Sequence, residues 1–553
     1  MAPIAADGSG VRSAAVSCQG RPRRRGLGTV ALAVVLAAAC ADAGVETRSA
    51  QRAASAEPGG PAPSATDAPA ADDSPSTTDG SPSTPGQAPN EPAPTSTPVP
   101  ASAPATGTGP PDAAEPPGPN DDLASAGDSL FPELGSSTID VQSYDVRIAY
   151  DPSTQEIDGQ VVIDLNGQPS EQVVLDAGDL RVDAVLVDGI DAQFEQRGEE
   201  LVIWPVTPGR QLSVDVRYQD QADDGASAAG LNVGWFATAT GSYVLNEPDG
   251  AHSWLPSNDH PSDKALWRFE ITVPAGLTAV ANGALVEERP GDGTTTWVWE
   301  ESDPMATYLV QLLTGEYTVI DGGNYGVVPL VHVALTDDAA LMQPYFDVTD
   351  DQLAFFEPLF GPYPLERYGL AITESFGGLA METQGRSLFS RDDLPGGEPG
   401  VIEHNLLSHE LAHQWFGNAV TPADWSDLWL NESFASYAAW LWLDHIGIFP
   451  LEQTAEGTLA TRQYGSESTG EPTLGNLFGF ERYDGGAVVL HALRRELGDE
   501  AFFAVLQTWV ADNDGTSRTT DDFVGTAEQV AGRSLTEFFD TWLYATDLPD
   551  GYP

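Results

Sequence analysis

The sequence predicts a multidomain α+β protein, in which an antiparallel β-sandwich-like domain precedes a mainly α-helical domain and a disordered tether precedes both. Three patterns along the chain of 553 residues lead to this prediction. The first is a long stretch without large apolar residues, the second a series of short alternating runs, and the third a set of longer runs with helical periodicity. The chain is also long enough for two or three domains.

Residues 1–40 have the features of an export signal. A basic cluster, RPRRR at 21–25, precedes the apolar run ALAVVLAAA at 31–39, which is too short to span a bilayer as a helix. Small residues followed by Cys40 resemble a bacterial lipobox, although Ala37 stands where Leu is usual; in a lipobox the cysteine is acylated. The pattern favours a signal peptide of lipoprotein type, with ordinary secretory cleavage or twin-arginine export as alternatives. We therefore expect an exported protein, either lipid-anchored to the outer face of the cytoplasmic membrane or secreted.

Residues 41–128 consist mainly of Ala, Pro, Ser, Thr, Gly and Asp. Such a segment cannot bury enough apolar surface to offset the loss of chain entropy on ordering, so it predicts a disordered tether. A flexible coil of this length spans about 50 Å on average. Behind a lipid anchor, it would hold the folded part of the protein away from the membrane.

The pattern of residues 129–326 predicts an antiparallel β-domain of sandwich type. Short runs with apolar residues at alternate positions recur there, separated by turn signals such as NGQ, PAG and GDG. Lys264, the only lysine of the chain, lies in this segment, and we expect it to make a structural pairing within the domain. The runs are YDVRIAY (144–150), QVVIDL (160–165), EQVVLDA (171–177), ELVIWPV (200–206), QLSVDVRY (211–218), LWRFEITV (266–273) and TTTWVWE (294–300).

Residues 327–553 have longer periodic runs, which predict the mainly helical domain. Gly498 follows one such run and is a typical helix stop. Thr519–Asp522 and Ser534–Glu537 each fit a capping box, in which a hydroxyl and a carboxylate three residues later bond each other's backbone N–H groups. The expected elements are helices over 349–361 and 482–498 and a strand over 366–374.

Composition excludes one class of partner. The formal net charge is −59, and binding to nucleic-acid phosphates requires clustered Lys and Arg, so no nucleic-acid partner is expected. The hydrophobic content of 41% is enough for packed cores. The two cysteines, Cys18 and Cys40, both precede the predicted folded domains, which therefore contain no disulfide framework.

The strongest chemical signal is the stretch HELAHQWFGNAVTPADWSDLWLNE, residues 409–432. Residues four apart share a helix face, so His409 and His413 direct their imidazoles to one point, with Glu410 beside them. A catalytic zinc ion takes three protein ligands and keeps one position open. HExxH supplies two ligands and a candidate general base, and Glu432 on the next helix is placed to supply the third ligand. The stretch predicts one Zn²⁺ per chain; the alternative is an accidental HExxH on a surface helix.

HELAHQWFGN followed by WSDLWLNESFASY resembles the gluzincin zinc metallopeptidases of the aminopeptidase N and leukotriene hydrolase family. WLPSNDHPSDKALWRFEITVP and ATYLVQLLTGEY are similar to that family's N-terminal β-domain, so the resemblance covers about 129–553. It implies a thermolysin-like catalytic domain over 327–553, and we expect a short bacterial form without the family's large C-terminal helical domain. The family often has Gly where this chain has Ser433, a change that we expect to leave zinc ligation unaffected.

The resemblance implies three further site residues. The family's exopeptidase signature, Gly-Ala-Met-Glu-Asn, corresponds to Leu379–Thr383, which retains Glu382 but has Thr383 in place of Asn. The signature Glu pairs with the α-ammonium of a substrate and so places the first peptide bond at the metal. Glu247 corresponds to a second amine-binding Glu, and Tyr483 to a Tyr that bonds the oxyanion of the intermediate. The alternatives are a solvated loop carboxylate for Glu247 and a packed aromatic for Tyr483.

The sequence thus predicts a zinc-dependent aminopeptidase that acts on peptides with a free N-terminus. Glu410 would activate the attacking water, and Tyr483 would stabilise the oxyanion. One alternative is a zinc hydrolase of an epoxide or ester, as the leukotriene branch of the family suggests. Another is a catalytically silent surface binding protein on the same fold, although such relatives would be expected to lose ligands or the base.

Overall fold

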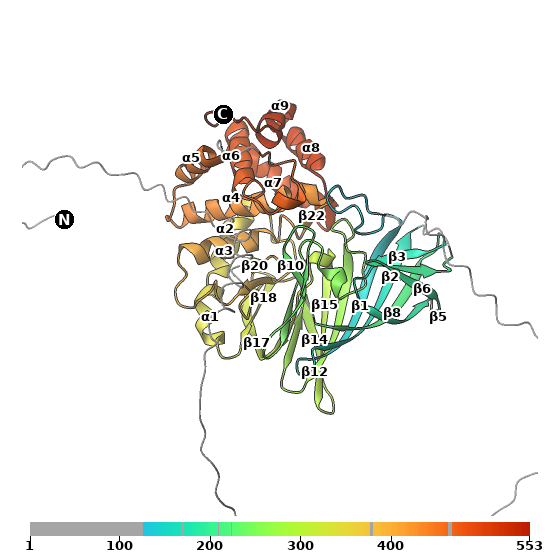
Figure 1. Ribbon diagram of the computed structural model, residues 1–553. Helices are drawn as coiled ribbons and strands as arrows, with labels where there is room; N and C mark the ends of the chain where they lie inside the picture. The colour runs from blue at the N-terminus through green and yellow to red at the C-terminus, as the bar shows by residue number, and fades with distance from the viewer. Residues whose placement is uncertain (1–124, 168–170, 208, 223, 377–379, 463–466) are drawn as a thin grey trace, which may run out of the picture.

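The computed structural model describes residues 125–553 except 168–170, 208, 223, 377–379 and 463–466. The expected export signal, with Cys40, and all but the last residues of the expected tether lie outside the described residues. In Figure 1 the β-rich N-terminal part, coloured blue to green, lies beside the helical part, coloured yellow to red. The predicted β-sandwich followed by a mainly helical catalytic region is confirmed.

The largest sheet of the N-terminal part has eight strands and forms one layer of the sandwich. Apolar residues alternate along it as predicted: in its first strand Val146, Ile148 and Tyr150 point into the core while their neighbours face solvent. Its strands are β1 (Ile139–Asp151), β2 (Glu156–Gly167), β4 (Arg181–Val187), β5 (Ile190–Asp191), β8 (Leu212–Gln221), β12 (Ala265–Pro274), β14 (Ala284–Pro290) and β15 (Thr294–Met305), in the spatial order β14-β15-β12-β1-β2-β8-β4-β5.

Two smaller sheets complete the N-terminal part. Residues of the five-stranded sheet, such as Trp235 and Val244, share one hydrophobic core with the eight-stranded sheet, so the two sheets pack against each other. The five-stranded sheet contains β9 (Asp224–Ala226), β10 (Asn232–Ala237), β11 (Ser242–Leu245), β13 (Thr278–Ala281) and β16 (Leu312–Gly315), and the three-stranded sheet contains β3 (Val173–Asp176), β6 (Gln193–Arg197) and β7 (Glu200–Trp204).

The expectation of purely antiparallel pairing is wrong at one place. Strands β1 and β12 run parallel, with Val146 opposite Phe269. Between these strands the chain passes through the other sheets, so β12 re-enters beside β1 in the same direction, as a crossover connection allows. Local alternation in the sequence carries no information about which strands pair.

A five-stranded sheet begins the catalytic region, and its edge bears a predicted site residue. Strands β17 (Tyr317–Tyr325), β18 (Val328–Leu335), β19 (Leu370–Thr373), β21 (Ser387–Ser390) and β20 (Ala380–Met381) lie in that order. The shortest strand, β20, is thus the edge strand, and Glu382 follows it directly. A two-stranded sheet of β22 (Val420–Pro422) and β23 (Thr516–Arg518) lies farther along the chain.

The helices of the catalytic region pack around one central helix, in which nearly every residue is buried. That helix, α4 (Trp429–His445), packs against the helix that carries HExxH, α3 (Val401–Ala412). The other helices are α1 (Ala339–Phe346), α2 (Thr349–Phe360), α5 (Leu451–Arg462), α6 (Asp484–Leu497), α7 (Asp499–Asn513), α8 (Thr520–Ala531) and α9 (Thr536–Phe539); the single-turn helices are η1 (Ala251–Ser253), η2 (Thr307–Leu309), η3 (Trp425–Asp427), η4 (Leu474–Asn476) and η5 (Asp540–Tyr544).

Of the two predicted capping boxes, one is confirmed and one is wrong. Thr519 caps α8 and exchanges hydrogen bonds with Asp522 as expected. At the second, the hydroxyl of Ser534 instead donates to Glu528 of the preceding helix, and α9 begins after Leu535. A carboxylate from a neighbouring helix therefore replaces the local partner.

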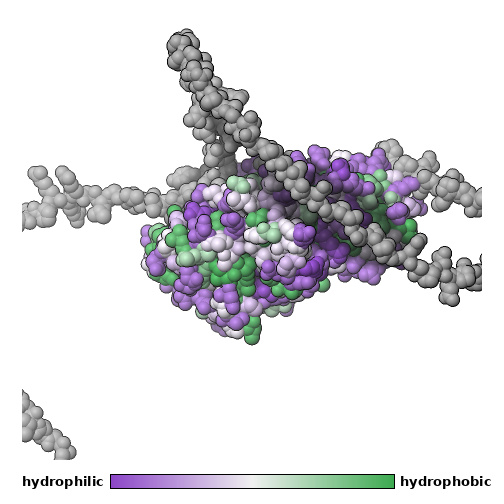
Figure 2. Space-filling model, turned by 90° about the horizontal axis from the view of Figure 1, so that it is seen from below, coloured by the Kyte–Doolittle hydropathy of each residue, from purple (hydrophilic) through white to green (hydrophobic). Residues whose placement is uncertain are grey.

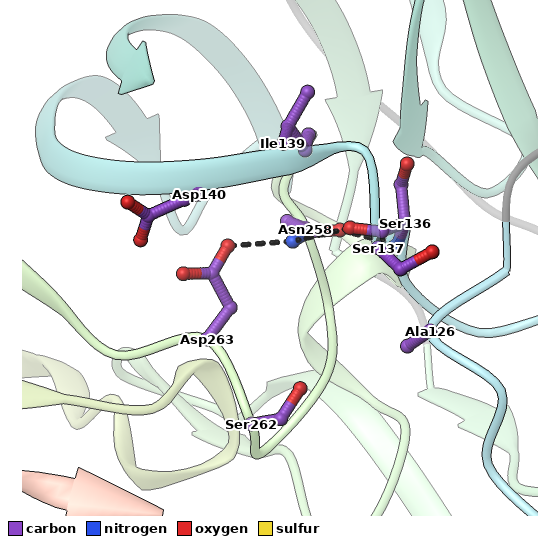
Figure 3. Close-up of a pocket in the computed structure, with 8 residues that line it drawn as sticks. All are labelled: Ala126, Ser136, Ser137, Ile139, Asp140, Asn258, Ser262 and Asp263. Carbon is purple, nitrogen blue, oxygen red and sulfur yellow. Dashed lines mark hydrogen bonds between the residues drawn. The ribbon is translucent and has the colours of Figure 1, made fainter. Parts of the chain in front are cut away.

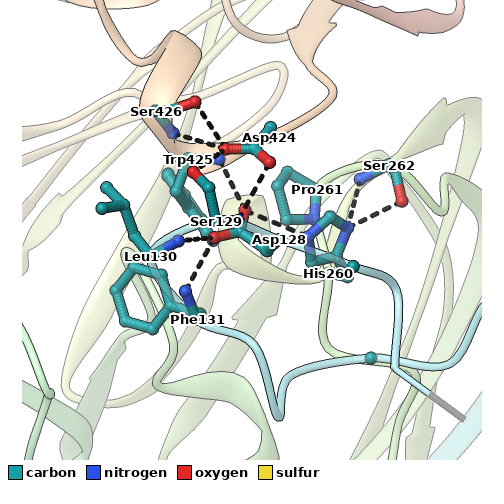
Figure 4. Close-up of polar contacts among 12 residues, drawn as sticks. Asp128, Ser129, Leu130, Phe131, His260, Pro261, Ser262, Asp424, Trp425 and Ser426 are labelled. Carbon is teal, nitrogen blue, oxygen red and sulfur yellow. Dashed lines mark hydrogen bonds and ion pairs between the residues drawn. The ribbon is translucent and has the colours of Figure 1, made fainter. Parts of the chain in front are cut away.

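The start of the described chain is fixed at the junction of the two parts (Figure 4). The carboxylate of Asp128 accepts hydrogen bonds from the backbone N–H of Trp425, at 2.7 Å, and from the ring of His260, at 3.3 Å. Ser129 bonds Asp424 through both its backbone N–H and its hydroxyl. One short segment thus joins the β-sandwich to the loop that leads into α4.

A small polar cavity of about 180 Å³ lies near this junction (Figure 3). Its polar groups bond one another or the backbone: Asn258 donates to Asp263, and Asp263 also accepts from the N–H of Val141. Its lining contains no histidine or cysteine. The cavity is therefore distinct from the predicted zinc site.

The surface is mixed in character. On the face shown in Figure 2, hydrophilic and hydrophobic residues are interspersed. Of the most exposed large apolar side chains, Val327 lies in the tight turn between β17 and β18, and Ile190 directly follows the tight turn between β4 and β5. Within the described part of the chain, no helix combines the length and the apolar run that crossing a membrane requires.

Candidate active site

Helices α3 and α4 place three ligand-type side chains at one point. His409 lies in the last turn of α3, His413 is the C-cap residue of α3, and Glu432 lies in the first turn of α4. An oxygen of Glu432 lies 3.0 Å from Nε2 of His409 and 3.4 Å from Nε2 of His413, and the two Nε2 atoms are 3.1 Å apart. The spacing of HExxH and the later Glu therefore has the geometric result expected for a shared ion.

This donor set fits a zinc ion. In a tetrahedral site with bonds of about 2.0–2.1 Å, neighbouring ligand atoms lie about 3.3 Å apart, close to the three distances found here. The ring of His413 donates its Nδ1–H to the carbonyl of Phe416 at 3.1 Å, which directs its Nε2 lone pair into the site. Two imidazoles and one carboxylate, all largely buried, are the ligands of many catalytic zinc sites.

Glu410 lies on α3 next to this donor set. Its carboxylate is almost completely buried, and one of its oxygens has no hydrogen-bond partner among the described residues. Burial raises the pKa of Glu410 well above its usual value, and repulsion from Glu382 and Glu432 adds to the effect of burial. An unsatisfied buried carboxylate beside a zinc-type donor set is placed to accept a proton from a water there.

Glu382 lies immediately after the edge strand β20 and reaches the same place. Ligand atoms of Glu382, Glu410 and His413 all lie within 4.8 Å of one another. Two side chains at the end of the zinc helix hold the Glu382 backbone: Gln414 and Asn418 each donate to its carbonyl, at 3.2 and 2.6 Å. One carboxylate oxygen of Glu382 has no hydrogen-bond partner among the described residues.

The departure from the exopeptidase signature at Thr383 has a structural role. The hydroxyl of Thr383 donates to the carbonyl of Arg386 and accepts from the amide of Gln311, at 2.5 and 2.8 Å. It therefore closes the turn that follows Glu382 and ties this turn to the N-terminal part. Leu379, the first position of the signature, lies outside the described residues.

Glu247 approaches from the N-terminal part, on the loop after β11. The preceding residue, Asn246, fixes this loop by donating to the carbonyl of Val310 and accepting from the indole N–H of Trp254. One oxygen of Glu247 is buried without a partner among the described residues. Burial raises the pKa of Glu247 well above its usual value, and repulsion from Glu382 is the next cause.

Three further carboxylates, those of Glu382, Glu410 and Glu247, therefore converge on the donor set. Burial alone would lower the pKa of His413, but Glu382, Glu432 and Glu410 outweigh it and raise this pKa to about 10. Burial would raise the pKa of Glu432, but the two histidines outweigh it and lower this pKa to about 2. So much negative charge in a buried space favours cations, both a divalent metal ion and an ammonium group.

Tyr483 also lies beside the donor set. It is the N-cap residue of α6, and its ring lies nearly parallel to the ring of His409, with the centroids 6.0 Å apart. Its backbone has φ −92° and ψ −99°, outside the helical region. The structure thus brings together all seven predicted site residues: His409, Glu410, His413, Glu432, Glu382, Glu247 and Tyr483.

Two residues that the sequence did not assign to the site support it from the N-terminal part. The hydroxyl of Tyr308 donates to the carbonyl of Gly417 and accepts from the amide of Asn431, the residue before Glu432. It therefore joins the ends of both zinc helices. The phrase ATYLVQLLTGEY was similar to the family's β-domain, but sequence spacing gives no sign that its tyrosine contacts these helices.

The other residue is Lys264, for which the expected pairing within the β-domain is wrong. Its ammonium donates to the backbone carbonyls of Asn418 and Ala419, at 2.6 and 3.1 Å, just beyond the zinc helix. Burial lowers the pKa of Lys264 to about 7. The lone lysine therefore joins the two parts of the chain, because β12 begins next to this loop.

Comparisons with known families agree with this geometry. Residues 345–542 match the peptidase family M1 domain, and residues 141–309 match the peptidase M1 N-terminal domain. The chain is 27% identical over 436 residues to a probable aminopeptidase 1 of Saccharolobus solfataricus, a match that covers 75% of this chain and 54% of that protein. The chain spans about half the length of the curated relatives it matches.

Solved structures of M1 zinc metallopeptidases are also similar to this chain. The M1 zinc metallopeptidase of Deinococcus radiodurans has a TM-score of 0.70 and 30% identity to this chain, covering 77% of this chain and 98% of that one. A mutant M1 zinc metallopeptidase from the same organism, bound to a Tyr-Ser-Ala substrate, has a TM-score of 0.69 and 28% identity, with coverage of 77% and 98%.

Proposed function

Because the chain belongs to peptidase family M1, we propose that it is a zinc-dependent aminopeptidase that releases N-terminal residues from peptides. The observation that carries this proposal is the position of two carboxylates, those of the buried Glu382 and the partly buried Glu247, beside the His-His-Glu donor set. Each has an oxygen without a hydrogen-bond partner among the described residues. An α-ammonium would satisfy these oxygens, so that a free chain terminus binds with its first peptide bond at the donor set.

The side chains have complementary roles in this reaction. Zinc held by His409, His413 and Glu432 would polarise the scissile carbonyl and lower the pKa of a water. Glu410 takes the proton of the attacking water and delivers it to the departing amine, which leaves as the new N-terminus. Tyr483 donates its phenolic hydrogen bond to the oxyanion that develops on the carbonyl oxygen.

The test uses the purified zinc-loaded protein, a panel of amino-acid arylamides, and the same arylamides N-acetylated. We expect hydrolysis of the free compounds and little or no hydrolysis of the acetylated ones. Treatment with a chelator should abolish all hydrolysis. Equal hydrolysis of free and acetylated compounds would show that the carboxylates do not select an amine. In that case the chain would be an endopeptidase or a general hydrolase.

Two other functions are tested when a lipid epoxide and an ester are added to this panel. Hydrolysis of a lipid epoxide or an ester in preference to every arylamide would point to the leukotriene-hydrolase type of reaction. Stoichiometric zinc with no turnover of any free-amine substrate would point to a surface binding protein. Neither outcome is expected, because the chain has every residue that we propose as a ligand, as the base or as an amine-binding carboxylate.

We further propose that the protein acts outside the cytoplasm, anchored through a lipid on Cys40. The basic cluster, the short apolar run and the small residues before Cys40 support this proposal. In the bacterium that makes the protein, the wild type should incorporate labelled fatty acid and sediment with membranes, whereas Cys40→Ala should do neither. Release of the unmodified wild type into the medium would instead indicate secretion.

A further inference from the structure

We propose that helix α4 positions Tyr483 through two hydrogen bonds, from Ser433 and Trp440, that hold the residues on either side of it. The proposal rests on the proposed function, because it concerns the residue assigned to the oxyanion. Ser433 directly follows Glu432 on α4, and Trp440 lies two helical turns farther along the same helix face.

The first hydrogen bond fixes the peptide unit before Tyr483. The hydroxyl of Ser433 donates to the backbone carbonyl of Arg482 at 2.5 Å. Both residues are completely buried, so no water competes for this carbonyl. The guanidinium of Arg482 also donates to the carbonyls of Ser468 and Thr469, which holds the same residue from its other end.

The second hydrogen bond fixes the residue after Tyr483. The indole N–H of Trp440 donates to the carboxylate of Asp484 at 3.2 Å. Asp484 is the first residue of α6. Tyr483 therefore lies between two anchored neighbours, and both anchors come from the helix that bears the ligand Glu432.

The packing of α6 on α4 makes these anchors close and rigid. A Cβ added at Gly486 would lie 1.7 Å from the hydroxyl oxygen of Ser433 and 2.5 Å from its Cβ. Only glycine therefore allows α6 to approach near enough for the hydroxyl to reach Arg482. The Tyr-x-x-Gly phrase of the sequence thus has a packing reason that depends on Ser433.

This arrangement has a chemical consequence for the proposed reaction. The backbone carbonyl of Tyr483 accepts a hydrogen bond from the N–H of Ala487 in α6, but Tyr483 has non-helical dihedral angles, so helix geometry alone does not set its direction. The two hydrogen bonds set the separation between the phenol and the ligand Glu432. Since the phenol acts on charge that develops in the transition state, misplacing it should lower kcat more than it raises KM.

The experiment is a double-mutant cycle on the zinc-loaded protein. Ser433→Ala and Trp440→Phe are each made alone and together with Tyr483→Phe. Ser436→Ala and Trp442→Phe are the matched controls on α4: Ser436 is buried and makes no hydrogen bond among the described contacts, and the indole of Trp442 bonds His404 instead. For each variant kcat and KM are measured, together with zinc affinity by chelator competition and binding of a free-amine phosphinate dipeptide, which mimics the tetrahedral intermediate.

We expect Ser433→Ala to lower kcat by about tenfold and Trp440→Phe by about fivefold, with KM changed by less than about twofold. Phosphinate affinity should fall in parallel, whereas zinc affinity should stay the same. In the Tyr483→Phe background neither substitution should have a further effect, because the phenol that they position is gone. Both control variants should behave as the wild type.

If Ser433→Ala and Trp440→Phe lower kcat as much in the Tyr483→Phe background as they do alone, the inference is overturned, since Ser433 and Trp440 would then have a general structural role. A loss of zinc affinity in Ser433→Ala, or an unchanged kcat in both single variants, would also overturn it. A wild type that neither hydrolyses arylamides nor binds the phosphinate would overturn the proposed function, and this inference with it. If the wild type is active but the variants give one of the contrary results above, the inference is overturned and the proposed function stands.

Discussion

The two sides of the active site are built in different ways. The ligand side consists of His409, His413 and Glu432, which lie on two helices that pack directly on each other. The amine side consists of Glu382 and Glu247, which lie beyond an edge strand in one part of the chain and on a loop in the other.

Different interactions hold the two sides. Helix periodicity and the contact of α3 with α4 set the ligand side, and Tyr308 and Lys264 support the ends of its helices from the β-sandwich. On the amine side, hydrogen bonds between distant segments hold the residue next to each carboxylate: Gln311 bonds Thr383, which follows Glu382, and Asn246, which precedes Glu247, donates to the carbonyl of Val310. We infer that amine selection can be lost while metal binding persists, and the following predictions test that separation.

The largest expected effect concerns the base that lies between the two sides. Glu410→Gln should lower kcat by about 10³-fold, because the amide cannot accept the proton of water, while zinc affinity stays near that of the wild type. Steady-state kinetics and zinc titration measure both. Glu432→Gln is the contrast, since it removes a ligand and should weaken zinc binding. Near-normal turnover by Glu410→Gln would mean that another group is the base.

Glu382→Gln should separate the two sides most clearly. It removes a charge that pairs with the α-ammonium, so kcat/KM for free arylamides should fall by about 100-fold. Zinc affinity should not change, and hydrolysis of acetylated substrates should stay at the low rate of the wild type. Glu374→Gln, which alters a nearby acid bonded to Thr238 and Thr240, serves as the control. An equal loss for both substrate classes would indicate damage to the whole site.

A smaller effect is expected at the turn that supports Glu382. Thr383→Val keeps the shape but removes the hydroxyl that bridges Gln311 and Arg386, so Glu382 should be held less firmly. We expect a loss of about fivefold in kcat/KM for free-amine substrates, with unchanged zinc affinity. Thr458→Val on α5 is the control. Loss of zinc from Thr383→Val would contradict the separation of the two sides.

The smallest expected effect is on stability and depends on pH. His252 braces the loop that carries Glu247, by bonding Asp259 at 2.8 Å. Burial alone would lower the pKa of His252, but the hydrogen bond and the charges of Asp259, Asp176 and Asp249 outweigh it and raise the pKa to about 9. Since the usual value is about 6.5, the stabilisation is complete below pH ~6.5 and is lost as the pH rises through about 9.

Urea unfolding across this range gives the measurement. The free energy of unfolding should fall by at most about 3 kcal/mol between pH ~6.5 and ~9.5, and His252→Gln should flatten that fall. His445→Gln, which alters a histidine stacked on Phe355 in the helical part, should leave the slope as in the wild type. An identical slope in all three proteins would show that His252 does not carry a buried charge.

The sequence was most informative where structure is local. The spacing of HExxH predicts two ligands because helix geometry alone brings His409 and His413 together, and the third ligand, Glu432, follows on the next helix, α4, which packs directly on α3. The helices over 349–361 and 482–498 correspond to α2 and α6, and Gly498 ends α6 as expected. The Thr519 capping box also needed no distant partner.

Where tertiary contacts decide, the sequence was less informative. Ser534 bonds a carboxylate of the preceding helix, and Lys264 bonds a loop of the other part of the chain. The parallel pairing of β1 with β12 depends on the path of the chain through other sheets. Glu382 and Glu247 were assigned only through the family resemblance, because no spacing rule joins residues so far apart in sequence.

The most direct test of the separate amine side uses a protein that binds but does not react. Zinc-loaded Glu410→Gln is titrated by calorimetry with a tripeptide and with the same tripeptide N-acetylated. We predict that acetylation weakens binding by at least about 30-fold, because it removes the charge that Glu382 and Glu247 pair with. Equal affinity for the two peptides would contradict the account, since the buried carboxylates would then have no part in selecting a free N-terminus.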